Sequence, residues 1–124
     1  MGYITIDNID SVMKEMQEDS FYIPKVLFKD KKYKKISVDS KILYGLLLDR
    51  QIQIKKEFND PIINKIYFSY ALNEIANDLG CSCNKALKLL NELLSVDLVE
   101  KQKQTIGKPA MLYVNELGLE GIEI

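Results

Sequence analysis

One stretch of this 124-residue chain, residues 71–114, constrains the fold more than any other feature of the sequence. A short helix is expected over residues 71–79, where apolar residues recur at helical spacing. It stops at Gly80, because glycine is the usual residue for a left-handed helix C-cap. Ser82 is a favourable N-cap for a second helix that continues to about Ser95. These two helices with a tight turn between them predict a helix-turn-helix.

Two strands are expected after the second helix, over residues 98–103 and 111–114. The loop that joins them contains Gly107 and Pro109, which favour a turn. The helix pair alone is also typical of an ordinary helical hairpin in an all-α protein. Because a hairpin follows directly, we predict an α+β fold: a winged helix-turn-helix with an N-terminal helical extension.

The second helix has two different faces when projected at about 100° per residue. One face is apolar and carries Ala86, Leu89, Leu90 and Leu93. The other is polar and carries Asn84, Lys88, Asn91 and Ser95, with Lys85 and Glu92 at its flanks. The first turns of such a helix enter the major groove of DNA, where Asn suits adenine and Lys suits guanine or phosphate. The candidate DNA contacts on this helix are Ser82, Asn84, Lys85, Lys88 and Asn91.

The formal net charge of −1 conceals an uneven distribution. Residues 1–20 carry a net charge of −4 and residues 115–124 carry −3, whereas residues 25–41 carry +5. A local basic patch can attract phosphate whatever the total charge, although a lysine run is also typical of a solvated loop. The candidate contacts in the basic segment are Lys31, Lys32, Lys34, Lys35 and Lys41. Those in the wing are Lys103, Gln104, Thr105 and Lys108.

Side-chain chemistry excludes most catalytic and metal-binding functions. The chain has no histidine, which removes His-based triads, His general bases and mixed Cys/His zinc sites. Cys81 and Cys83 are too few for a four-thiolate site, and we expect them to be small packing residues, with a regulatory thiol as the alternative. Gly107-Lys108 lacks the remainder of a phosphate-binding P-loop. We expect no enzyme activity, no metal and no cofactor.

Two features of the sequence bear on location. The longest apolar run, around Leu46-Leu47-Leu48, is far shorter than the ~20 residues that span a bilayer. The N-terminus is acidic and lacks the basic and apolar regions of a signal peptide. We therefore expect a cytoplasmic protein without a membrane partner.

The remaining core elements are a long helix and a strand. Ser37 is expected to cap a helix that continues to about Lys56 and is apolar around most of its circumference, which predicts a central and buried position. Residues 66–70 are expected to form a strand beside the wing strands.

The N-terminal segment has a different character. Asp7 or Asn8 is expected to cap a helix with a narrow apolar stripe on an otherwise acidic surface. This stripe either packs on its own domain or contacts a partner subunit. Leu87 and Leu94 similarly widen the apolar face of the second helix. We predict a homodimer whose candidate contacts are Ile9, Val12, Met13, Met16, Leu87 and Leu94.

Several blocks of sequence, in one order, resemble the N-terminal domain of the RepA-N-type plasmid replication initiators of Gram-positive bacteria. The matching blocks are FYIPKVLF at 21–28, YK at 33–34 with IS at 36–37, KILYGLLLDR at 41–50, KALKLLNEL at 85–93, GKP at 107–109 and YV at 113–114. The chain departs from the family at Ala110, where Asn is frequent, at Asp97, where Gly is frequent, and around residues 59–64.

The resemblance implies a function that the spacing of residues does not show. Family members bind repeated sites, or iterons, in the plasmid origin and begin the assembly of the host replication machinery. They are longer, with a C-terminal domain that resembles primosomal helicase-loading proteins. We accordingly expect residues 1–20 to be an extension, residues 21–116 the DNA-binding domain and residues 117–124 a tail toward an absent C-terminal domain that contacts host replication proteins. A winged-helix transcriptional repressor and a protein-interaction module without DNA binding are the alternatives.

Overall fold

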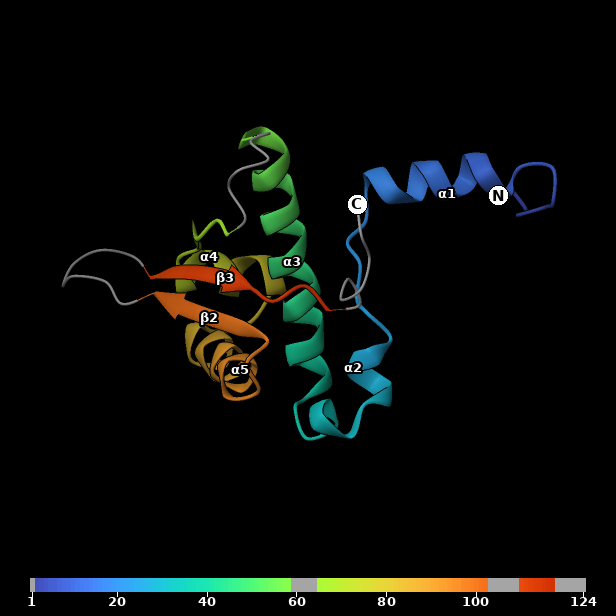
Figure 1. Cartoon of the computed structure of the whole chain (residues 1–124). Coiled ribbons are helices and arrows are strands. Elements are labelled where there is room, and N and C mark those ends of the chain that lie inside the picture. Colours follow the sequence, from blue (N-terminus) through green and yellow to red (C-terminus); the bar gives the residue numbers. More distant parts are fainter. Residues whose placement is uncertain (1, 59–64, 103–109, 118–124) are drawn as a thin grey trace.

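The computed structural model describes residues 2–58, 65–102 and 110–117 (Figure 1). The described elements are α1 (Ile9–Glu18), α2 (Val26–Lys29), the 3₁₀ helix η1 (Lys31–Tyr33), α3 (Val38–Phe58), β1 (Phe68–Ser69), α4 (Leu72–Leu79), α5 (Cys83–Ser95), β2 (Val99–Gln102) and β3 (Met111–Val114). The strands form an antiparallel sheet in the order β1-β3-β2. A helix-turn-helix followed by a hairpin confirms the predicted α+β winged-helix fold.

The turn between α4 and α5 forms as its sequence predicts. Gly80 has a φ of 72°, and its N–H donates to the carbonyls of Ala76 and Asn77, which ends α4. The Ser82 hydroxyl accepts a hydrogen bond from the Lys85 N–H at 3.1 Å, which begins α5. These local caps set the path of the chain between the two helices.

The sheet buries one face against the helices and leaves the other accessible. Val99 pairs with Val114, and Phe68 pairs with Leu112, and all four side chains are buried. The strand expected over residues 66–70 is shorter, because only Phe68–Ser69 pairs with β3. The wing loop, residues 103–109, lies outside the described residues.

Helix α3 is central, as predicted, and runs between α5 and the segment that contains α2 (Figure 1). Leu43, Tyr44 and Leu47 have no exposed surface, and Ser37 caps the helix by accepting from the Ser40 N–H at 3.1 Å. Gly45 permits close approach of the preceding segment, since a Cβ there would lie 2.8 Å from the side chains of Phe21 and Ile23. In the described part of the chain, α3 included, no helix combines the length and apolarity needed to cross a membrane.

A buried amide joins α3 to the sheet. The Gln51 Nε2 donates to the Val114 carbonyl at 2.8 Å, and the Gln51 Oε1 accepts from the Val114 N–H at 2.7 Å. The side chain thus replaces a neighbouring strand for this residue of β3 and satisfies buried backbone groups that would otherwise be costly. The Tyr44 hydroxyl also donates to the Asn115 carbonyl at 2.6 Å. These contacts hold the hairpin at a set position on α3.

The N-terminal helix forms but stands apart from the domain (Figure 1). None of its residues is buried, and Met13 and Met16 are 51% and 56% exposed. Packing on its own domain therefore does not explain its apolar stripe. Asn8 is the N-cap residue, one of the two expected, but its side chain does not cap the helix: its Oδ1 accepts from the Thr5 N–H at 2.7 Å and its Nδ2 donates to the Tyr3 carbonyl at 2.9 Å.

Candidate nucleic-acid interface

Helix α5 presents the polar face expected of a recognition helix. Its apolar side chains, Ala86, Leu89, Leu90 and Leu93, are buried in the core. Its polar side chains, Ser82, Asn84, Lys85, Lys88, Asn91 and Ser95, are exposed. Asn84, Lys88 and Asn91 line one shallow hollow on this surface. Exposed amide and ammonium groups on one face of a helix have the donors and acceptors that read base edges.

Glu92 attaches α5 to the N-terminus of α3. Its Oε1 accepts from the Ser37 N–H at 2.8 Å, and its Oε2 accepts from the hydroxyls of Ser40 at 2.9 Å and Ser37 at 3.1 Å. Burial raises the pKa of Glu92, but these hydrogen bonds and the positive charge of Lys88 outweigh that effect and hold the pKa below its ordinary value. Helical periodicity predicts only that Glu92 lies at the flank of the helix, because its partners lie more than 50 residues earlier in the chain.

Lys85, a predicted DNA contact, is engaged within the protein. Its Nζ lies 2.9 Å from the Oδ2 of Asp39, which belongs to the first turn of α3. Both side chains are about half exposed. The hydrogen bond to Asp39 and its charge raise the pKa of Lys85. Lys85 is therefore protonated at neutral pH, but its charge is compensated in the free domain.

The basic segment is structured and leads into the start of α3, which bonds to α5. Tyr33 and Ile36 are buried, and the Asp30 carboxylate caps η1 by accepting from the Lys32 N–H at 2.9 Å. The predicted contacts that remain exposed are Lys31, Lys32, Lys34 and Lys35. None of these four forms an ion pair with a carboxylate of the described residues. These four lysines precede Ser37, whose N–H donates to Glu92 of α5.

Lys41 does not belong to this exposed set. Its side chain is only 6% exposed, and its Nζ lies 4.7 Å above the centre of the Phe28 ring. The prediction of an exposed phosphate contact at Lys41 is wrong in this structure, because the packing of α2 against α3 turns the side chain onto an aromatic face.

Two further expectations about packing need correction. Cys83 is exposed rather than packed, although Cys81 is partly buried against the core, and both thiols are free. Leu94, a predicted dimer contact, also packs against its own core, whereas Leu87 is 42% exposed. The predicted wing contacts Lys103, Gln104, Thr105 and Lys108 lie outside the described residues.

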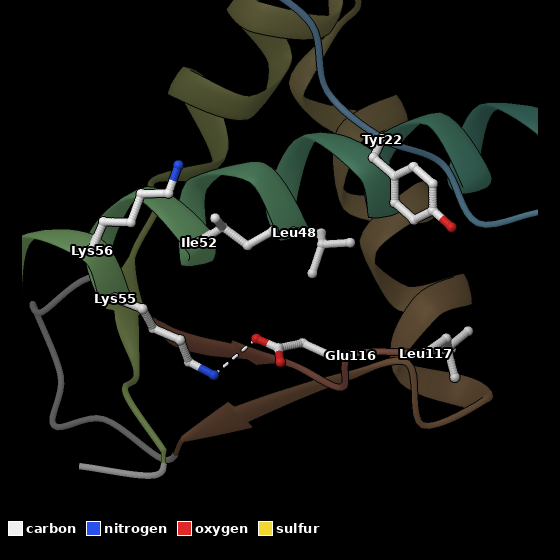
Figure 2. Close-up of a pocket in the computed structure, with 7 residues that line it drawn as sticks. All are labelled: Tyr22, Leu48, Ile52, Lys55, Lys56, Glu116 and Leu117. Carbon is white, nitrogen blue, oxygen red and sulfur yellow. Dashed lines mark hydrogen bonds and ion pairs between the residues drawn. The ribbon is translucent and has the colours of Figure 1, made fainter. Parts of the chain in front are cut away.

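A cavity of about 500 Å³ lies away from these predicted contacts (Figure 2). Its lining residues are Tyr22, Leu48, Ile52, Lys55, Lys56, Glu116 and Leu117. Lys55 and Glu116 form an ion pair at 2.8 Å along one side of it. Among the described residues, none of the predicted DNA contacts lines this cavity, so it is separate from the α5 surface.

Comparison with solved structures identifies similar domains. A structure described as the N-terminal domain of a DNA-binding protein aligns with a TM-score of 0.68 and 29% identity over 94% of this chain and 84% of the other. A structure of a Rep–DNA complex aligns with a TM-score of 0.68 and 30% identity over 93% and 84% of the two chains. A structure described as an MDR initiator aligns with a TM-score of 0.64 and 31% identity over 93% and 86%.

Sequence comparison agrees with the structural similarity. No curated protein sequence matches the chain significantly. The family model described as the replication initiator protein A (RepA) N-terminus matches residues 20–123. The match covers most of the chain, including the helix-turn-helix, and confirms the resemblance found in the sequence blocks. The chain therefore belongs to the family of replication initiator protein A N-terminal domains.

Proposed function

We propose that this domain binds duplex DNA at repeated sites in a plasmid origin and thereby starts plasmid replication. The observation that carries the proposal is the exposed polar face of α5, together with four exposed lysines before α3 that lack described ion-pair partners. The similarity to a Rep–DNA complex and membership of the initiator family support it. A face of this kind supplies both elements of specific DNA binding: phosphate contacts that position and base contacts that specify.

The proposal assigns different tasks to the predicted contacts. Asn84 and Lys88 read base edges in the major groove, with Ser82, Lys85 and Asn91 beside them. The exposed lysines of the basic segment contact phosphate. The wing residues Lys103 and Lys108 are proposed to contact the backbone as well, with Gln104 and Thr105 between them.

Substitutions separate base reading from backbone contact. Asn84→Ala and Lys88→Ala should each weaken binding to a repeat-containing duplex by about 1–3 kcal/mol, with a much smaller loss on random DNA. Lys103→Ala and Lys108→Ala should weaken both duplexes alike. Gln53→Ala, an exposed α3 position outside the proposed interface, serves as the control. Equal losses of affinity on both DNAs for the Asn84 and Lys88 variants would show that α5 only positions the domain on the DNA backbone.

Salt dependence tests the electrostatic part of the proposal. Affinity for the repeat duplex should fall at least about a thousandfold between 50 and 200 mM salt, because several lysine–phosphate contacts release counterions. A nearly constant affinity over this range would contradict phosphate binding by the basic surface.

A footprint across the plasmid replication gene tests the site itself. Protected tandem repeats support an initiator, a single protected palindrome would indicate a repressor, and no protection would indicate an interaction module.

We further propose that two copies associate through α1. The exposed stripe of α1 supports association, since Met13 and Met16 also line a shallow apolar hollow with Phe21 and Tyr22. Light scattering on the whole chain should show a dimer, and a chain starting at Ser20 should show a monomer. A monomeric whole chain would refute dimerisation, and an undiminished dimer of the shortened chain would remove α1 as its cause.

A further inference from the structure

An acidic residue lies within the surface that the proposed function assigns to DNA. Asp39, in the first turn of α3, is half exposed and pairs with Lys85 in the early part of α5 at 2.9 Å. A carboxylate at this place repels phosphate, so an electrostatic benefit to DNA binding does not explain it.

The pair is held by buried contacts between the two helices. The hydroxyl of Ser40, the residue after Asp39, donates to Glu92 at 2.9 Å and also lies 3.2 Å from the Leu89 carbonyl. Ser37, two residues before Asp39, donates from its N–H to Glu92 at 2.8 Å. The start of α3 is thereby fixed against the middle of α5, which brings Asp39 to Lys85 by rigid packing rather than by the chance meeting of two surface side chains.

Lys85 differs in this respect from the neighbouring exposed lysines. Lys31, Lys32, Lys34 and Lys35 have no ion-pair partner among the described residues, so their charges are available to phosphate. An ammonium has three donors, and Asp39 occupies one of them. The remaining two suit the O6 and N7 acceptors of guanine, whereas the restraint opposes movement of the ammonium toward the DNA backbone.

We propose that Asp39 is a specificity-determining residue that restrains Lys85 for base reading and withholds its charge from phosphate. The inference rests on the proposed function, in which α5 enters the major groove. Binding to random DNA depends almost entirely on phosphate neutralisation, so a restrained lysine contributes little to it. Binding to the cognate site retains the base contacts of α5. Asp39 thus lowers the affinity for random DNA and thereby increases the ratio of cognate to random affinity.

The test compares Asp39→Asn with the unchanged domain on a repeat-containing duplex and on a random duplex. Random affinity should rise about eightfold at 100 mM salt, and its log–log salt slope should steepen by about 0.9, the effect of one added phosphate contact. Cognate affinity should not rise. In a Lys85→Gln background, Asp39→Asn should have no such effect, because the released charge is absent.

A matched control removes a carboxylate from another ion pair. Glu116→Gln breaks the Lys55–Glu116 pair, which has a similar separation of 2.8 Å and lines the cavity that is separate from the α5 surface. The change in net charge is identical, but random affinity should change less than about twofold, because distant surface charges are screened at this salt concentration.

Three results would overturn the inference. The first is an equal rise on both duplexes, the second is no rise on random DNA, and the third is an Asp39→Asn effect that persists in the Lys85→Gln background. If the unchanged domain itself fails to distinguish repeat from random DNA, the proposed function fails and the inference is rejected with it. If the domain discriminates and Asp39→Asn leaves the ratio unchanged, the inference alone fails.

Discussion

Helices α1 and α5 have the same kind of amphipathic pattern but different surroundings. Each has apolar residues at spacings of three and four on one side and polar residues on the other. In α5 the apolar side is buried, with Leu93 fully inaccessible. In α1 no residue is buried, and Met13 is half exposed. An amphipathic pattern therefore predicts a helix reliably, but it does not identify the surface against which that helix packs.

The difference arises from contacts that the pattern does not contain. Helix α5 is held by Glu92 on α3, by the Ser82 cap and by the core beneath it. Helix α1 begins without a side-chain cap. Helix α5 is a fixed part of the domain, whereas α1 presents an apolar stripe for which we propose a partner copy.

The largest expected effect is the loss of stability when an apolar side chain of α5 is truncated, compared with the same change on α1. Leu93→Ala should lower the free energy of unfolding by about 2–5 kcal/mol, because it leaves a cavity in the core. Met13→Ala should change it by less than about 0.5 kcal/mol in the monomer. Urea unfolding at several protein concentrations measures both. A loss for Met13→Ala that is independent of concentration would show that α1 packs on its own domain, and one that grows with concentration would indicate burial between copies.

Removing the anchor of α5 should have the next largest effect. Glu92→Ala should lower the free energy of unfolding by about 1.5–3 kcal/mol, because hydrogen bonds to a carboxylate are lost and the Ser37 N–H loses its acceptor. The matched control is Glu74→Gln, which breaks only the exposed Arg50–Glu74 pair at 3.6 Å and should cost less than about 1 kcal/mol. Equal losses would show that Glu92 contributes no more than a surface ion pair.

The Glu92 contribution should also depend on pH. Its folded pKa lies below its ordinary value of 4.5, so the unfolded chain binds the proton more readily. The contribution is therefore complete above pH 4.5 and is lost as the pH falls through the folded pKa. The free energy of unfolding is measured between pH 7 and pH 3 for the unchanged domain and for Glu92→Gln. It should fall less on acidification in the variant than in the unchanged domain. Parallel curves would contradict the assignment.

The smallest effects concern the turns at either end of α5. Gly80→Ala should lower the free energy of unfolding by about 1–2 kcal/mol, because φ is 72°. An added Cβ would meet no atom within 4 Å, so the substitution tests backbone conformation alone.

Asp97 has a φ of 59°, and Asp97→Gly should raise the free energy of unfolding by about 0.5–1 kcal/mol. The hydrogen bond from Asn115 to the Asp97 carbonyl does not involve the side chain that is removed. Thermal unfolding measures both variants. A lower stability of Asp97→Gly would contradict the expected relief of backbone strain.

Much of the helix-turn-helix was predictable because its signals are local. Gly80 and Ser82 act on backbone groups within a few residues, so their roles follow from sequence position. Lys41 and Cys83 were assigned wrongly because their exposure depends on how separate elements pack. Gln51 was missed as an anchor because its partner, Val114, lies 63 residues away.

The sequence by itself determined the order of elements, the turn after α4 and the division of α5 into a buried and a polar face. These follow from helical periodicity and from capping groups that act over one turn of chain. Only the tertiary structure decided which charges are available at that polar face. It paired Lys85 with Asp39, placed Lys41 over Phe28 and left Lys31 and Lys32 without a described carboxylate partner. The physical reason is that electrostatic interactions depend on distances in space, and the contacts of α3 with α5 and with α2 bring together groups that are far apart in the chain.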